Sequence, residues 1–233
     1  MLIAIVVISL AILICFLLAV ANFAGERFME KFQEMDKIAI KSQITPLQFV
    51  EYLNNRNFQG RLKIIQISQV ANDRYGNGNI FLSTNTLSKN SLASYSIIAH
   101  ELGHAKQDFE GKKLKRLSSL RRIGKMLGVL MFPLLIAGGI LALIGDKLLW
   151  WGVGLMALSL LIFIVALFIK LRTISIEKEA SKFALDFLKS ILQDDELKKC
   201  KKFLDDARLT YWSDFLRALL GWTMLTKKSK LFN

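Results

Sequence analysis

The chain has almost no cysteine and no pair that could form a disulfide. Its 233 residues include only Cys15, in an apolar run, and Cys200, in a polar stretch, and neither belongs to a Cys-x-x-Cys motif. A disulfide-stapled secreted domain and a Cys-x-x-Cys zinc site are therefore excluded, and a reducing compartment fits this composition. The sequence also contains no internal repeat and no low-complexity tract.

Histidine is equally scarce, yet the two that exist are four residues apart in the sequence His-Glu-Leu-Gly-His, with His100, Glu101 and His104 in the pattern H-E-x-x-H. Positions i and i+4 of a helix share one face. Both imidazoles can therefore bind one zinc ion, and the glutamate between them can take a proton from a zinc-bound water. The alternative is a pair of histidines without a metal.

Long runs without charge account for the high apolar content, 53% hydrophobic residues with a mean hydropathy of +0.37. Three such runs each approach the roughly 20 residues that a helix needs to cross a bilayer: Leu2 to Phe23, Met126 to Ile144 and Leu148 to Ile169. The second and third runs predict a helical hairpin whose tip is Gly145-Asp146-Lys147. Trp150 and Trp151 follow this tip, as is typical of the membrane interface.

The first run has an alternative interpretation as a cleaved signal peptide, since Ala19-Val20-Ala21 is similar to a cleavage site. No Lys or Arg precedes the run, which disfavours this interpretation.

Charge predicts the topology, because basic flanks stay on the cytoplasmic side. We expect a membrane helix at 1–24 with its N-terminus outside, a cytoplasmic catalytic segment at 25–125, a membrane hairpin at 126–169 and a cytoplasmic helical segment at 170–233. The net charge of +13 is concentrated partly in the basic stretch 112–125, which favours anionic lipid as a partner over nucleic acid. The predicted location is the cell membrane.

Between the apolar runs, helices are predicted from Thr45, an N-cap before Pro46, through Leu53, and from Ser91 to Glu110. Two short strands, 62–67 and 80–83, flank turn formers at 72–79 and predict a β-hairpin. Further helices are expected at 175–192, 194–208 and 211–225, the last packed on the domain or lying in the interface. The fold class is therefore a mainly α membrane protein with a small zincin-like domain.

A catalytic zinc usually has three protein ligands, and the sequence contains no third histidine. The metzincin extension requires Gly and His where Gln107 and Glu110 stand, so that subclass is excluded. Asp108 lies one turn after His104 and is a candidate for the third ligand or for a hydrogen bond to an imidazole.

The other candidate is Glu177, which shares a helix face with Ser181 at the edge of an apolar stripe. Glu179 is turned about 200° away from Glu177 and is expected to face water. Glu177 is therefore the better candidate for the third ligand, and Asp108 is expected to contact an imidazole or to lie on the surface.

At three places the chain resembles the membrane-bound neutral zinc metallopeptidases of the YugP type: Ala99 to Ala105, Ile176 to Ser181, and Leu209-Thr210-Tyr211. The order of these motifs is also similar to that of HtpX-like and CaaX-type membrane peptidases. The resemblance covers nearly the whole chain, with Lys178 as one departure. It implies a zincin-like fold, one Zn2+ per chain, and Glu177 as the third ligand.

The resulting hypothesis is a zinc-dependent endopeptidase at the cytoplasmic membrane surface, with Glu101 as general base and a peptide or protein as substrate. Strand addition at Ile80-Phe81-Leu82-Ser83 could hold the substrate, and Arg208 or Tyr211 could stabilise transition-state charge. The alternatives are a non-catalytic membrane protein with a structural or sensory zinc, and a membrane-anchored adaptor.

Overall fold

The computed structural model describes residues 2–68, 72–111 and 114–219, and these residues are mainly helical, with one small sheet. Contacts divide the chain into two units. Among the described residues, the apolar unit comprises 2–26, 118–174 and 209–219, and the mixed unit comprises 27–68, 72–111, 114–117 and 175–208. The long helices α1 (Leu2–Asp36), α6 (Asp146–Leu188) and α7 (Asp194–Leu219) each contribute residues to both units.

Two helices of the mixed unit begin where the sequence predicts. Helix α2 (Pro46–Phe58) has Thr45 as its N-cap, and Thr45 and Gln48 form a reciprocal capping box. Helix α4 (Leu92–Phe109) has Ser91 as its N-cap, whose hydroxyl accepts a hydrogen bond from the backbone N–H of Ser94. Such caps satisfy backbone N–H groups that have no partner within the helix, so local chemistry sets both boundaries.

The sheet differs from the predicted hairpin. It has three strands in the order β1-β3-β2, with β1 (Lys63–Ile67) parallel to β3 (Asn79–Ser83) and β2 (Arg74–Gly76) antiparallel to β3. The predicted pairing of 62–67 with 80–83 as a hairpin is therefore wrong. Asn77 and Gly78 both have positive φ angles, 51° and 76°. A two-residue turn of this kind joins β2, which ends at Gly76, directly to β3, so the hairpin partner of β3 is β2 and not β1.

The strand order also overturns the predicted substrate strand. Because β3 is the central strand, Ile80 and Phe81 are paired on both sides, while Leu82 and Ser83 pair with β1 and the backbone N–H of Ser83 donates to Asp73, so this segment cannot take another strand by edge addition. Ile80 and Leu82 are instead fully buried in the core. Among the described strands, the sheet edges are β1 and β2.

One hydrophobic core holds the mixed unit together, and helix α4 lies within it. Fourteen of the eighteen residues of α4 are buried. The core also takes side chains from α1, α2, β3, α6 and α7, among them Met35, Phe49, Ile80, Leu188 and Phe203. Burial on this scale fixes the position and rotation of α4, and with them the histidine motif.

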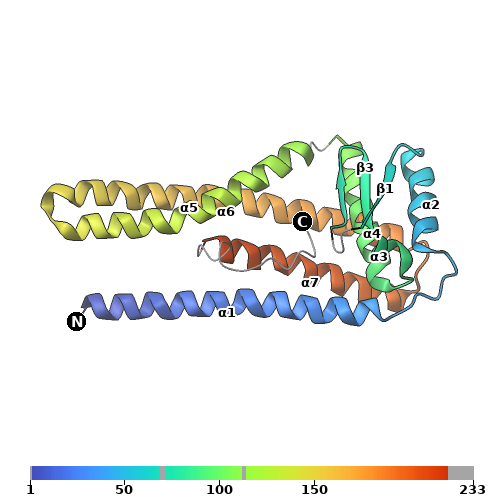
Figure 1. Ribbon diagram of the computed structural model, residues 1–233, viewed down its shortest axis with the longest axis horizontal. Helices are drawn as coiled ribbons and strands as arrows, with labels where there is room; N and C mark the ends of the chain where they lie inside the picture. The colour runs from blue at the N-terminus through green and yellow to red at the C-terminus, as the bar shows by residue number, and fades with distance from the viewer. Residues whose placement is uncertain (1, 69–71, 112–113, 220–233) are drawn as a thin grey trace. The chain divides into compact units, whose positions relative to one another are not determined.

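In the apolar unit, α5 (Leu114–Ile144) and α6 run side by side and are joined at Gly145 (Figure 1). A φ of 154° at Gly145 breaks the helix there. Gly138 and Gly152 let the two backbones touch, since a β-carbon at Gly138 would lie 2.8 Å from the carbonyl oxygen of Gly152. A one-residue connection thus replaces the predicted three-residue tip.

Two described helical segments are long and apolar enough to cross a membrane, Arg122–Ile144 and Asp146–Leu188. The predicted first span forms part of α1, and its crossing of a membrane stays a prediction. Helix α6 continues without a break into the helix expected at 175–192, since no Gly or Pro separates them. Helix α7 likewise joins the two helices expected at 194–208 and 211–225, and the part beyond Leu219 lies outside the described residues.

Candidate metal centre

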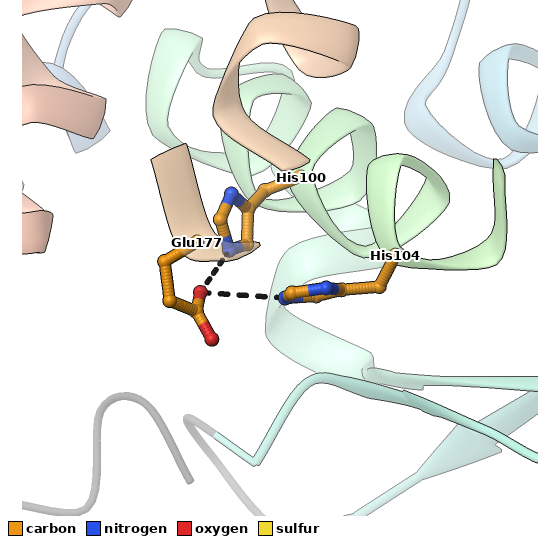
Figure 2. Close-up of side chains that lie close together, drawn as sticks. All are labelled: His100, His104 and Glu177. Atoms are coloured by element: carbon orange, nitrogen blue, oxygen red, sulfur yellow. Dashed lines mark hydrogen bonds and ion pairs between the residues drawn. The ribbon is translucent and has the colours of Figure 1, made fainter. Parts of the chain in front are cut away.

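Helices α4 and α6 bring His100, His104 and Glu177 together within the mixed unit (Figure 2). The two imidazoles project from successive turns of α4, and the carboxylate reaches them from α6. His100 and Glu177 are buried, and His104 is half-buried. The spacing in the sequence therefore places both rings on one face, as the helical period requires.

The distances within this group fit a tetrahedral zinc site. Glu177 Oε2 lies 3.2 Å from His100 Nε2 and 3.4 Å from His104 Nε2, and one ligand atom from each residue lies within 4.8 Å of the others. Ligands about 2.0–2.1 Å from a zinc ion stand roughly 3.3 Å apart in a tetrahedron. Two imidazole nitrogens and one carboxylate are also a ligand set that catalytic zinc uses.

Each imidazole uses its other nitrogen for a contact with the protein. His100 Nδ1 lies 3.3 Å from the hydroxyl of Ser181, and His104 Nδ1 lies 3.0 Å from Oε1 of Gln107. Both rings thus direct Nε2 toward Glu177. Contacts of this kind orient metal-binding histidines and set their tautomers.

Glu101 is buried beside the histidines and does not belong to the group of three. Its Oε2 accepts a hydrogen bond of 2.7 Å from the backbone N–H of Tyr75 on β2. Burial raises the pKa of the Glu101 carboxyl, as does the charge of Glu177, while the two histidines act in the opposite direction. A raised pKa favours a carboxylate that takes a proton and then returns it.

The charge of Glu177 also acts on His104. Burial by itself disfavours the charged imidazole, but the Glu177 carboxylate outweighs burial and raises the pKa of His104 to about 9. An imidazolium beside a carboxylate is the state expected of such a site without a cation. A bound cation would take the place of this proton.

Tyr75 and Gln107 are functional candidates that the sequence analysis missed. Tyr75 donates a hydrogen bond of 2.6 Å from its hydroxyl to Asp108 and accepts one from the backbone N–H of Gly78. Burial and the neighbouring Asp108 raise the pKa of Tyr75 to about 12. No signal in the sequence marks Gln107 as a partner of His104, and none marks Tyr75 within a stretch of turn formers.

Other predicted site residues lie elsewhere. The Asp108 carboxylate accepts a hydrogen bond from the hydroxyl of Tyr75 rather than from an imidazole. Arg208 pairs with Asp205, and Tyr211 belongs to the apolar unit, where Lys170 lies over its ring. Glu179 is half-buried and accepts a hydrogen bond from Gln107, so its predicted exposure to water is wrong: the α4–α6 packing covers it.

A largely buried His-His-Glu group beside the glutamate of an H-E-x-x-H helix is the arrangement of zinc-dependent hydrolases. A scan of family models agrees with this class. The model described as "Putative neutral zinc metallopeptidase" matches residues 8–227, and the chain belongs to this family. No curated protein and no solved structure matches the chain.

Proposed function

We propose that the protein is a zinc-dependent endopeptidase that cleaves peptide bonds at the cytoplasmic surface of the cell membrane. The observation that carries this proposal is the convergence of His100, His104 and Glu177 at zinc-ligand spacing beside the buried Glu101. Zn2+ held by these three residues would polarise the scissile carbonyl and lower the pKa of a bound water to about 7.

In this scheme Glu101 is the general base. It takes a proton from the attacking water and delivers it to the leaving amine nitrogen. The backbone N–H of Tyr75 holds one carboxylate oxygen of Glu101, which leaves the other oxygen to face the reacting atoms.

The membrane part of the proposal rests on the apolar unit. Helices α5 and α6 expose many large apolar side chains, among them Leu143, Trp150 and Trp151 at 77%, 77% and 72% exposure. Exposed apolar surface of this kind marks an interaction site, here a bilayer. The N-terminus is outside, the hairpin tip is outside, and the basic stretch 112–125 contacts anionic lipid on the cytoplasmic side.

Glu101→Gln tests the catalytic scheme. The amide oxygen of the variant still accepts a hydrogen bond from Tyr75, so we expect about one zinc per chain to be retained while hydrolysis of a peptide library falls roughly 10²–10⁴-fold. Unchanged hydrolysis in Glu101→Gln would reject the scheme. Zinc binding without hydrolysis in the wild type would favour a structural or sensory metal.

A single cysteine at the hairpin tip tests the topology. In a Lys147→Cys variant in which Cys15 and Cys200 are changed to serine, a membrane-impermeant maleimide should label intact cells. Labelling only after cell lysis would place the tip in the cytoplasm and the catalytic segment outside, which is the reverse of the proposed topology.

A further inference from the structure

Gln107 lies at the junction of α4 and α6 and is completely buried in the mixed unit. Its side-chain oxygen lies 3.0 Å from His104 Nδ1. Its side-chain nitrogen donates one hydrogen bond of 2.9 Å to the carbonyl oxygen of Ile176 and another of 2.9 Å to Oε2 of Glu179. Both amide N–H groups and the amide oxygen are therefore engaged.

The partners of Gln107 allow only one orientation of its amide. The backbone carbonyl of Ile176 is an acceptor without a proton, so the amide nitrogen must face it. The amide oxygen then faces His104, and because an amide oxygen only accepts, Nδ1 of His104 must carry a proton. This leaves Nε2 of His104 free of a proton when the ring is neutral, directed at Glu177 at 3.4 Å.

Through its hydrogen bond to Ile176, the Gln107 side chain also holds the turn of α6 that carries Glu177. Ile176 immediately precedes Glu177. One turn before Gln107, Gly103 lets α4 approach the backbone of Ala180, since a β-carbon at Gly103 would lie 2.3 Å from the Ala180 carbonyl oxygen. This close approach brings the Gln107 amide within hydrogen-bond distance of the α6 backbone.

We propose that Gln107 is the positioning residue of the metal centre: it fixes the tautomer of His104 and sets the distance between that ring and Glu177. This inference rests on the proposed zinc site. Gln107 acts through His104 and α6, and its role is recognised by zinc affinity rather than by turnover.

The test compares zinc affinity, measured with Zn2+ against a chelator, among variants of the detergent-purified full chain. We expect Gln107→Leu, which replaces the amide with an apolar side chain of similar size, to bind zinc about 10–100-fold more weakly. Glu179→Gln should remain within about threefold of wild type, because its amide oxygen still accepts from Gln107. Gln107→Glu should bind weakly, since it places two carboxylates side by side and loses the donor to Ile176.

Combining Gln107→Glu with Glu179→Gln restores a hydrogen bond between the two side chains with donor and acceptor exchanged. We expect the double variant to bind zinc at least about threefold more tightly than Gln107→Glu alone. A residue that only fills space would show no such rescue. A double variant no tighter than Gln107→Glu would overturn the proposal, and so would wild-type affinity in a folded Gln107→Leu protein.

A second readout is the tautomer itself. The chain has two histidines, so a ¹⁵N spectrum of the zinc-loaded, histidine-labelled protein contains two rings. We expect a proton on Nδ1 of His104 and the metal on Nε2, and the reverse arrangement would reject the inference. If wild-type protein binds no zinc, the proposed function fails as well, whereas wild-type zinc binding that Gln107→Leu leaves unchanged removes only the role of Gln107.

Discussion

Gly103 on α4 and Ala180 on α6 lie so close that a β-carbon at position 103 would fall 2.3 Å from the carbonyl oxygen of Ala180. Real β-carbons do not approach a backbone oxygen this closely, so no other residue fits without moving a helix. Gly103 lies between the two histidines in sequence, and Ala180 lies three residues after Glu177. The spacing of the three metal-ligand candidates therefore depends on the absence of one side chain.

For Gly103→Ala we expect zinc binding to weaken and the protein to lose about 1–3 kcal/mol of unfolding free energy, because the added methyl group forces α4 and α6 apart. Gly139→Ala is the matched control, since nothing lies within 4 Å of a β-carbon there and alanine is the better helix former by about 1 kcal/mol. Chelator competition and thermal unfolding measure both effects. Equal zinc affinity in the two variants would mean that the close contact does not position Glu177.

Glu177→Ala should lose the metal, with bound zinc falling from about one per chain to a small fraction, because two histidines alone hold zinc weakly. Asp108→Ala should keep its zinc, because the Asp108 carboxylate accepts from Tyr75. Metal analysis of the purified variants decides between the two acids. Zinc retained in Glu177→Ala and lost in Asp108→Ala would identify Asp108 as the ligand.

Tyr75→Phe removes a hydroxyl but keeps the backbone N–H that contacts Glu101. We expect a loss of about 0.5–1.5 kcal/mol for the hydrogen bond to Asp108, with zinc content unchanged. Because the pKa of Tyr75 is raised from 10 to about 12, this contribution is complete below pH 10 and is lost as the pH rises through about 12. Denaturation of wild type and variant should therefore differ by a constant amount from neutral pH to pH 10, and a difference that shrinks within this range would contradict the assignment.

Cys200 should resist alkylation in the folded protein. The residue is fully buried, and burial raises the pKa of its thiol to about 11. The reactive thiolate is then about one part in a thousand at pH 8, and access is blocked as well. Mass spectrometry after iodoacetamide treatment should find Cys200 modified only when denaturant is present, and rapid modification without denaturant would show that α7 opens readily.

Removal of the metal should lower the melting temperature. A ligand at a thousand times its dissociation constant stabilises the folded state by about 4 kcal/mol, and each kcal/mol corresponds to about 2–4 °C in a protein of 150–250 residues. Zinc-loaded and EDTA-treated wild type should differ accordingly in a thermal melt. His100→Ala is the control, since it should melt at the same temperature in both conditions.

The parts of the fold that the sequence predicted correctly are those set by local chemistry. Thr45 and Ser91 cap α2 and α4 because a short polar side chain satisfies N–H groups within the next three residues. The sheet was predicted wrongly for the opposite reason. The pairing of β1 with β3 joins segments on either side of β2, and a strand as short as β2 has no clear period of its own.

The candidate site divides in the same way. A spacing of four residues within one helix suffices to place His100 and His104 on a shared face, so the sequence determined that pair and the glutamate between them. The sequence favoured Glu177 over Asp108 as the third ligand without placing either beside the histidines, and neither Gln107 nor Tyr75 carried a signal. Only the tertiary structure brings Glu177 to the histidines, Gln107 to Ile176 and Tyr75 to Glu101. The physical reason is that these contacts depend on how closely α4 approaches α6 and β2, and packing of the whole mixed unit sets that distance.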